Sequence, residues 1–310
     1  MQKIITVFGS CAWDRTFKIG KDGEYPTEPT FESPGGKGAN QAVAAARGGA
    51  KDVAVHMISI VGDDDVGKKI IKNLVNEGIN TERVEILSGV ASDGANIRLD
   101  ENNENFIERI PNSAINYYTN QTITKNADLL KKSDVVLAQS KTSKEITKFL
   151  VEFCFENNID LIITPSNIEK FDPKDLEDIE LFKKVRYVAA NKKEALAITG
   201  TNSVEDALKI LPNMIVTKSE KGVAFVLEGK VVKFNALPAE VVDTTGAGDT
   251  FLGNFVASTV GRNYDFITSI KRGIVASTLK VAVKGAQTGM PQQNVVNEEF
   301  ENRLINEYNI

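Results

Sequence analysis

Asp243-Thr244-Thr245-Gly246-Ala247-Gly248-Asp249 is the stretch around which we expect the chain to fold, and it runs directly into an apolar segment. Gly246 and Gly248 allow backbone conformations that a side chain would forbid. Helically spaced apolar residues follow, so the stretch predicts a glycine turn that opens a helix. The N–H groups at such a helix end bind phosphate or a developing oxyanion. Asp249 is then either a catalytic carboxylate or a residue that stabilises the helix dipole, and the stretch alone does not decide.

The composition is that of an ordinary globular protein. The chain has 310 residues, 42% hydrophobic and 25% charged, with a net charge of -5 and no basic run. These values argue against nucleic acid as a partner. The N-terminal apolar run is too short for a signal peptide or a membrane span, so we expect a cytoplasmic protein without a membrane partner. Cys11 and Cys154 fit a reducing compartment, and a single histidine, His56, excludes a His-rich metal site.

β-rich runs alternate with helical segments through the second half of the chain. This alternation predicts a parallel sheet connected by right-handed crossovers. An earlier β-rich run at residues 4–10 ends in Gly9-Ser10 and is expected to be a buried first strand. No repeat or long linker divides the chain, so we expect residues 1–310 to form one domain. The later runs lie at residues 134–138, 160–163 and 186–190.

Two polar excursions, at about residues 15–34 and 92–111, interrupt this pattern. The second contains two alternating arms around a polar turn, which predicts a hairpin. Because both excursions are polar, we expect their strands to lie outside the main core as a small β lid. Exposed strand edges tend to be covered, so we also predict a homodimer through the lid.

A second glycine cluster, Pro34-Gly35-Gly36-Lys37-Gly38-Ala39-Asn40-Gln41, precedes an alanine-rich helix. Its glycines bring backbone N–H groups close to a ligand, and Lys37 and Asn40 offer polar contacts. A glycine turn with a helix cap explains the cluster equally well. Asp14 follows the first strand, where open parallel sheets bind ligands, but it could also be a solvated turn residue.

Asn191-Lys192-Lys193-Glu194 begins a helix at the end of a predicted strand. It fits a capping box in which Asn replaces Ser or Thr. It also fits a site in which Glu194 approaches a hydrated metal and phosphate group, and both interpretations stay open. A further strand at residues 214–217 leads into the polar glycine turn Lys218-Ser219-Glu220-Lys221-Gly222.

Taken in order, these motifs resemble the ribokinase family of PfkB-type carbohydrate kinases. The set comprises the glycine cluster, Asn191 with Glu194, the turn at residues 217–222, the Asp249 stretch and a loop at Lys284-Gly285-Ala286-Gln287. It spans nearly the whole chain. The resemblance implies a three-layer α/β fold with a mostly parallel central sheet and a small β-sheet lid. It also implies transfer of the γ-phosphate of ATP to a sugar hydroxyl, which requires mainly positioning and charge stabilisation.

The resemblance assigns a role to each site residue. Asp249 would accept the hydroxyl proton, while N–H groups of Gly246, Ala247 and Gly248 would stabilise the transferred phosphoryl group. The sugar would contact Asp14, Gly36, Lys37, Asn40 and the residue at position 141, which is Lys141 in this chain. ATP would contact Asn191, Thr217, Lys218, Ser219, Glu220, Lys221, Gly222 and Gly248. Glu194 would act on Mg²⁺ through water, and Asp243, Thr245, Lys280, Val283 and Gly285 would surround a monovalent cation, K⁺.

Two departures from the family pattern concern the sugar. Ala12 stands where ribokinases usually have Asn, and Lys141 replaces a sugar-contacting Glu. A changed set of hydroxyl partners alters which sugar fits, because unpaired polar groups discriminate strongly. Ribose is the first expected substrate. Another sugar, a nucleoside, or a sugar- or nucleotide-binding homologue without turnover are the alternatives.

Overall fold

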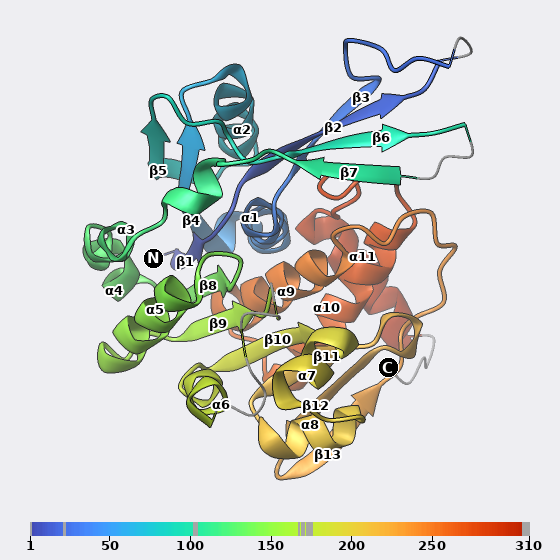
Figure 1. The fold of residues 1–310 in the computed structure, drawn as a ribbon. Coiled ribbons are helices and arrows are strands. Elements are labelled where there is room, and N and C mark those ends of the chain that lie inside the picture. The colour runs from blue at the N-terminus through green and yellow to red at the C-terminus, as the bar shows by residue number, and fades with distance from the viewer. Residues whose placement is uncertain are drawn as a thin grey trace.

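The computed structural model describes residues 2–20, 23–101, 105–166, 168, 171 and 176–305. A nine-stranded sheet crosses the molecule in the order β13-β12-β11-β10-β9-β8-β1-β4-β5 (Figure 1). The strands from β5 to β11 are parallel, and β12 and β13 are antiparallel, which confirms the predicted mostly parallel sheet. The bounds are β1 Lys3–Phe8, β4 Val53–Gly62, β5 Asn80–Leu87, β8 Val135–Gln139, β9 Leu161–Thr164, β10 Tyr187–Asn191, β11 Met214–Thr217, β12 Val223–Leu227 and β13 Lys230–Phe234.

Helices pack on both faces of this sheet because its central strands are apolar on both sides. In β8, Val135 and Leu137 belong to one buried cluster, and Val136 and Ala138 belong to the other. The first cluster lies under α1 Lys37–Gly49, α2 Asp65–Asn76, α9 Ala247–Val256 and α10 Phe266–Val281. The second lies under α3 Asn120–Thr124, α4 Ala127–Lys132, α5 Lys144–Glu156, α6 Leu176–Lys183, α7 Lys192–Thr199 and α8 Val204–Ile210. The three-layer fold is therefore confirmed.

The remaining helices are short or peripheral. The last helix, α11 Gln293–Ile305, packs through Val296 and Phe300 against α10. Short 3₁₀ helices span Ala50–Asp52, Ala114–Tyr117 and Ser219–Lys221, and a π-helical turn at Ala257–Gly261 follows α9. Among the described residues, none of the helices combines the length and the apolar character needed to span a membrane.

A separate four-stranded sheet, in the order β3-β2-β6-β7, projects from the edge of the main body (Figure 1). Its strands are β2 Ala12–Lys18, β3 Phe31–Gly35, β6 Ala95–Leu99 and β7 Asn105–Arg109. The predicted hairpin of β6 and β7 is present. Strand β2 begins at Ala12, before the predicted excursion at residues 15–34, because the chain leaves the main sheet after Phe8. Residues 21, 22 and 102–104 of the two excursions lie outside the described residues.

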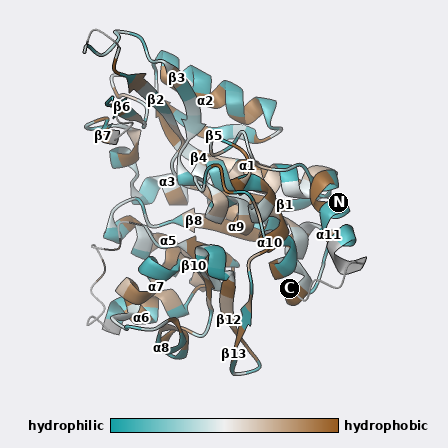
Figure 2. Ribbon diagram, turned by 90° about the vertical axis from the view of Figure 1, so that its right-hand side faces the viewer, coloured by the Kyte–Doolittle hydropathy of each residue, from teal (hydrophilic) through white to brown (hydrophobic). Residues whose placement is uncertain are grey.

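Close packing of α1 against α9 brings the two glycine clusters together. A side chain at Gly253 would meet Ala44 Cβ at 2.4 Å and Ala45 N at 2.6 Å. Only small residues at this crossing allow such an approach. Residues 250–256 of α9 are all buried, and Figure 2 shows the hydrophobic character of α9 beside the central strands. The first turns of α1 and α9 consequently lie side by side.

Candidate active site

The predicted glycine turn opens α9. Gly246 has a φ of 78°, in the left-handed region that favours glycine, and its carbonyl accepts a bond from Thr250 N at 2.8 Å. Gly248 differs from expectation, because its φ is not in that region and an added Cβ would meet nothing within 4 Å. Our expectation of a forbidden conformation there is wrong. The N–H of Ala247 donates to the Thr244 carbonyl at 3.1 Å, so this predicted anion donor is engaged within the turn.

The carboxylate of Asp249 is held by two amides from α1. Asp249 Oδ1 accepts a hydrogen bond from Gln41 Nε2 at 3.0 Å, and Oδ2 accepts one from Asn40 Nδ2 at 3.2 Å. Burial raises the pKa of Asp249, while the Lys37 ammonium and the two amides oppose the shift and Glu194 adds to it. Asp249 is therefore an oriented carboxylate with a raised pKa, as a general base requires.

The orientation of these two amides is fixed by a further layer of amides. Gln287 Nε2 donates to Asn40 Oδ1 at 3.0 Å, and Asn73 Nδ2 donates to Gln287 Oε1 at 2.8 Å. Gln139 Nε2 donates to Gln41 Oε1 at 2.7 Å. Because both amide oxygens are engaged, the nitrogens of Asn40 and Gln41 face Asp249. Sequence reasoning singled out the loop containing Gln287 but gave this residue no role.

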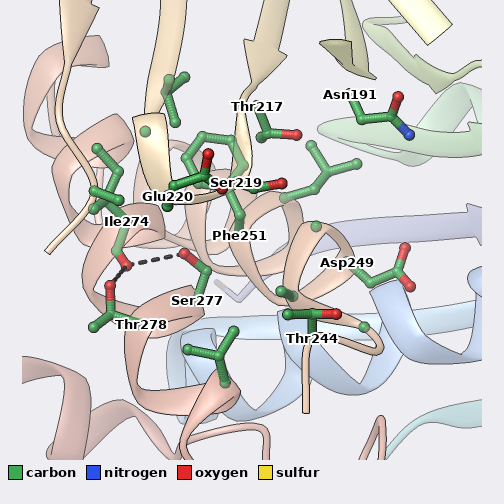
Figure 3. Close-up of a pocket in the computed structure, with 18 of the residues that line it drawn as sticks. Asn191, Thr217, Ser219, Glu220, Thr244, Asp249, Phe251, Ile274, Ser277 and Thr278 are labelled. Carbon is green, nitrogen blue, oxygen red and sulfur yellow. Dashed lines mark hydrogen bonds between the residues drawn. The ribbon is translucent and has the colours of Figure 1, made fainter. Parts of the chain in front are cut away.

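A cavity of about 870 Å³ opens on one side of Asp249. Figure 3 shows Asp249 at the beginning of α9, across the cavity from the strand ends that carry Asn191 and Thr217. Its lining includes Lys37 and Gln41 from α1, and six of the residues expected to contact ATP: Asn191, Thr217, Ser219, Glu220, Gly222 and Gly248. Lys218 and Lys221 instead line an adjoining cavity of about 810 Å³.

Asn191 and Glu194 form the capping box that the sequence allowed. Asn191 Oδ1 accepts from Glu194 N, and Glu194 Oε2 accepts from Asn191 N, both at 2.9 Å. The other oxygen, Oε1, lies 3.1 Å from Lys37 Nζ. Glu194 thus caps α7 and also reaches the cavity wall, so capping does not exclude a role beside a metal. Mg²⁺ bound to nucleotide phosphates keeps several waters, and one buried carboxylate fits that mode of binding. Among the described residues, no three His, Cys, Asp or Glu side chains converge as metal ligands.

Three of the residues expected to contact the sugar, Asp14, Gly36 and Lys141, lie near the base of the small sheet, whereas Lys37 lines the cavity beside Glu194. Gly35 lies against Asp14, since an added Cβ would be 2.6 Å from Asp14 Oδ2. Gly36 has a φ of 88°, and its Cβ would be 2.7 Å from Ala12 N. Burial raises the pKa of Asp14, an effect that the Ala95 N–H and the Lys141 ammonium oppose. The structure therefore brings Asp14, Gly36 and Lys141 into one neighbourhood.

Sequence reasoning missed a charged residue in this neighbourhood, Asp93. Its Oδ2 lies 2.7 Å from Lys141 Nζ, and its Oδ1 accepts a bond from Ser113 Oγ at 3.1 Å. Both partners of the ion pair are largely buried. Asp93 comes directly before Gly94, at the beginning of the second polar excursion. That position is the only sign of a role for Asp93 in the neighbouring sequence, because its partner Lys141 lies 48 residues away in the chain.

The residues expected around a monovalent cation also lie together. Asp243 Oδ1 accepts from Thr245 N at 2.8 Å, and its Oδ2 accepts from Gly285 N at 2.7 Å. These bonds hold the pKa of Asp243 below its usual range although burial opposes them. Lys280 Nζ donates to the carbonyls of Asp243 at 2.7 Å and Val283 at 3.3 Å. The turn before α9 is thereby tied to the loop after α10.

Comparisons with known proteins find relatives that match nearly the whole chain. The model of the pfkB family carbohydrate kinase matches residues 2–293. Ribokinase of Bacillus subtilis is 32% identical over 299 residues, covering 95% of this chain and 98% of the relative. Deoxyribokinase of Salmonella typhi is 32% identical over 311 residues, covering 95% and 97%. A crystal structure of ribokinase from Cryptococcus neoformans in complex with ADP is 25% identical, with a TM-score of 0.79 and coverage of 96% and 99%.

Proposed function

The chain belongs to the pfkB family of carbohydrate kinases, and we propose that it transfers the γ-phosphate of ATP to the hydroxymethyl group of a small sugar. Ribose is the first substrate we propose, with ribose 5-phosphate as the product. The observation that carries the proposal is Asp249, an oriented carboxylate that lines the cavity. The similarity to ribokinases over nearly the full length supports the same reaction.

In the proposed reaction, the sugar hydroxyl oxygen attacks the γ-phosphorus and the bond to the β–γ bridging oxygen breaks, releasing ADP. The hydroxyl proton passes to Asp249, which must be ionised to accept it. The positive end of α9 and the N–H groups of Gly246 and Gly248 stabilise the negative charge on the moving phosphoryl group. Ala247 joins them only if its N–H exchanges the Thr244 carbonyl for phosphate.

The cavity beside Asp249 is the proposed ATP site. Its far wall is lined by Asn191, Thr217, Ser219, Glu220 and Gly222, and Gly248 lines the wall next to the base. The absence of a side chain at Gly248 leaves space above the helix end for phosphate. When bound, Mg²⁺ would neutralise charge on the β- and γ-phosphates. Glu194 would hold it through water, and Lys37 balances the charge of that carboxylate.

The proposed sugar site is the neighbourhood of Asp14, Gly36 and Lys141. Asp14 supplies a half-buried carboxylate for sugar hydroxyls, and Gly36 and Asn40 limit the space beside the base. Lys141 and Asp93 together present one positive and one negative group at this end. This pair differs from the sugar-contacting Glu of the family pattern. It therefore favours a second candidate function, phosphorylation of another sugar or of a nucleoside. The similarity to a deoxyribokinase also supports a substrate other than ribose.

Two features support proposals on assembly and location. Phe31, Phe106 and Ile107 of the small sheet are exposed hydrophobic residues, and covering them would favour a homodimer through the lid. Cys11 and Cys154 are free and buried, and burial raises the pKa of each thiol to about 12. Such unreactive thiols are compatible with a reducing cytoplasm.

Release of ADP across a panel of sugars and nucleosides, with ATP and Mg²⁺, tests the proposed function. We expect the highest kcat/KM with a pentose, ribose first, and a product phosphorylated on its hydroxymethyl group by ³¹P NMR. A nucleoside as the best substrate would support the second candidate. A protein that shows ligand-dependent thermal shifts but releases no ADP with any acceptor would be a binding homologue and would overturn the proposal.

A further inference from the structure

Lys280 is a fully buried lysine at the end of α10, with a relative exposure of 0%. Burying an ammonium is costly unless it is hydrogen-bonded or paired. Here Nζ donates to two backbone carbonyls, 2.7 Å from Asp243 O and 3.3 Å from Val283 O. The carboxylate of Asp243 lies nearby and lowers the cost further. The ammonium thus sits in a small polar site built from the turn before α9 and the loop after α10.

Backbone carbonyls that converge from two loops are the kind of ligand that replaces the hydration shell of K⁺. Asp243 and Val283 belong to the set of residues that the resemblance assigns to a monovalent cation. A K⁺ ion at their point of convergence does not fit this chain, because Nζ already occupies it. A second positive charge next to the ammonium would also be repelled. The residues at this site are therefore incompatible with a bound monovalent cation.

We infer that the Lys280 ammonium takes the place of the monovalent cation, so that the enzyme is independent of K⁺. The ammonium links Asp243 to Val283, and Val281 O accepts further bonds from Val242 N at 2.8 Å and Asp243 N at 3.1 Å. These bonds hold the segment that enters the glycine turn at Gly246. Because this charge is covalently attached, it orders the turn at every salt composition. A bound ion would order the turn only at ion concentrations above its dissociation constant. The catalytic part of the inference rests on the proposed kinase function.

Activity in different chloride salts at constant ionic strength tests the inference. We expect the wild-type kcat/KM to change by less than about twofold between choline, Na⁺ and K⁺, with screening held equal. Lys280→Ala removes the ammonium and leaves the two carbonyls unpaired. Its activity should fall about tenfold in choline chloride, as for loss of a hydrogen bond to a charged group, and should recover in part with K⁺ or NH₄⁺. Lys184→Ala is the control, since Lys184 pairs with Glu152 away from the site and should show no cation response.

Thermal unfolding without substrate separates this inference from the proposed function. The midpoint of Lys280→Ala should rise with KCl relative to choline chloride, because K⁺ binds the folded state, and the wild-type midpoint should stay constant. Activation of the wild-type enzyme by K⁺ of about tenfold or more would overturn the inference. So would a Lys280→Ala protein that neither loses activity nor gains stability with K⁺. If that variant does not fold, the wild-type salt series decides, and Lys280→Met provides a variant of similar size without the charge.

Discussion

Replacing Gln287 with leucine tests whether the outer amides orient the catalytic carboxylate. Gln287 is buried and makes two side-chain hydrogen bonds, to Asn40 Oδ1 at 3.0 Å and from Asn73 Nδ2 at 2.8 Å. A net loss of about 1 kcal/mol for each bond, plus about 1–3 kcal/mol for leaving the Asn40 oxygen unsatisfied, gives about 3–5 kcal/mol of lost stability. Once released, Asn40 can turn its oxygen toward Asp249, which removes a donor from the carboxylate.

The loss of that donor has a kinetic consequence that a purely structural role would not have. One hydrogen bond of about 1.4 kcal/mol corresponds to a tenfold lower kcat/KM. The pKa of Asp249 should rise further, so the acid limb of the pH profile should move to higher pH. Urea unfolding and pH-dependent kinetics measure the two effects. Gln293→Leu is the control, because Gln293 also makes two hydrogen bonds, to Gly49 O and Asp52, away from the site. An unchanged pH profile in Gln287→Leu, with stability lowered, would refute the reasoning.

Gly253→Ala should lower the free energy of unfolding by about 1–3 kcal/mol, because the new methyl would meet Ala44 Cβ at 2.4 Å; unchanged urea unfolding would contradict this packing. Gly248→Ala should change the free energy of unfolding by no more than about 0.5 kcal/mol, because the new methyl meets no protein atom within 4 Å. It should lower kcat, because the methyl projects toward the proposed phosphate position; a wild-type kcat would contradict that position. Lys141→Met should raise KM for the sugar and leave KM for ATP unchanged, because it removes the ion-pair partner of Asp93; equal changes in both constants would contradict a sugar-specific role. The wild-type kcat/KM should fall as pH decreases through the raised pKa of Asp249, because the protonated acid cannot accept a proton. The midpoint of this acid limb of the pH profile should lie above the ordinary aspartate pKa of about 3.9. A midpoint at or below that value would contradict the raised pKa.

The local features of the fold and of the phosphoryl-transfer turn could be predicted because they depend on residues close together in the chain. Apolar spacing after Asp249 predicts α9, and the alternation of strands and helices predicts the parallel sheet, both of which the structure has. The positive φ of Gly246 also follows from its type and position. At Gly248 the sequence predicts a backbone conformation that only glycine adopts, whereas the structure shows only open space beside this residue.

The contacts that determine the chemistry of the site depend on residues distant in the chain. The pairing of Asp93 with Lys141 has no signature in either segment, so the sequence identifies Lys141 only as a departure. The Lys280 side chain points into the site where the resemblance implies a monovalent cation. Glu194 shows why one motif left two interpretations: it completes the capping box with one oxygen and approaches Lys37 with the other.

The central claim is that Asp249 accepts the proton of a sugar hydroxyl during phosphoryl transfer. A single-turnover measurement of sugar phosphate formation by Asp249→Asn, with ATP, Mg²⁺ and the best acceptor, tests it most directly. Asparagine keeps the size of the side chain but cannot act as the base, so the rate constant should fall about 10²–10⁴-fold, with ATP binding retained because Asn191 and the turn at residues 217–222 are untouched. A rate close to that of the wild type would contradict the account.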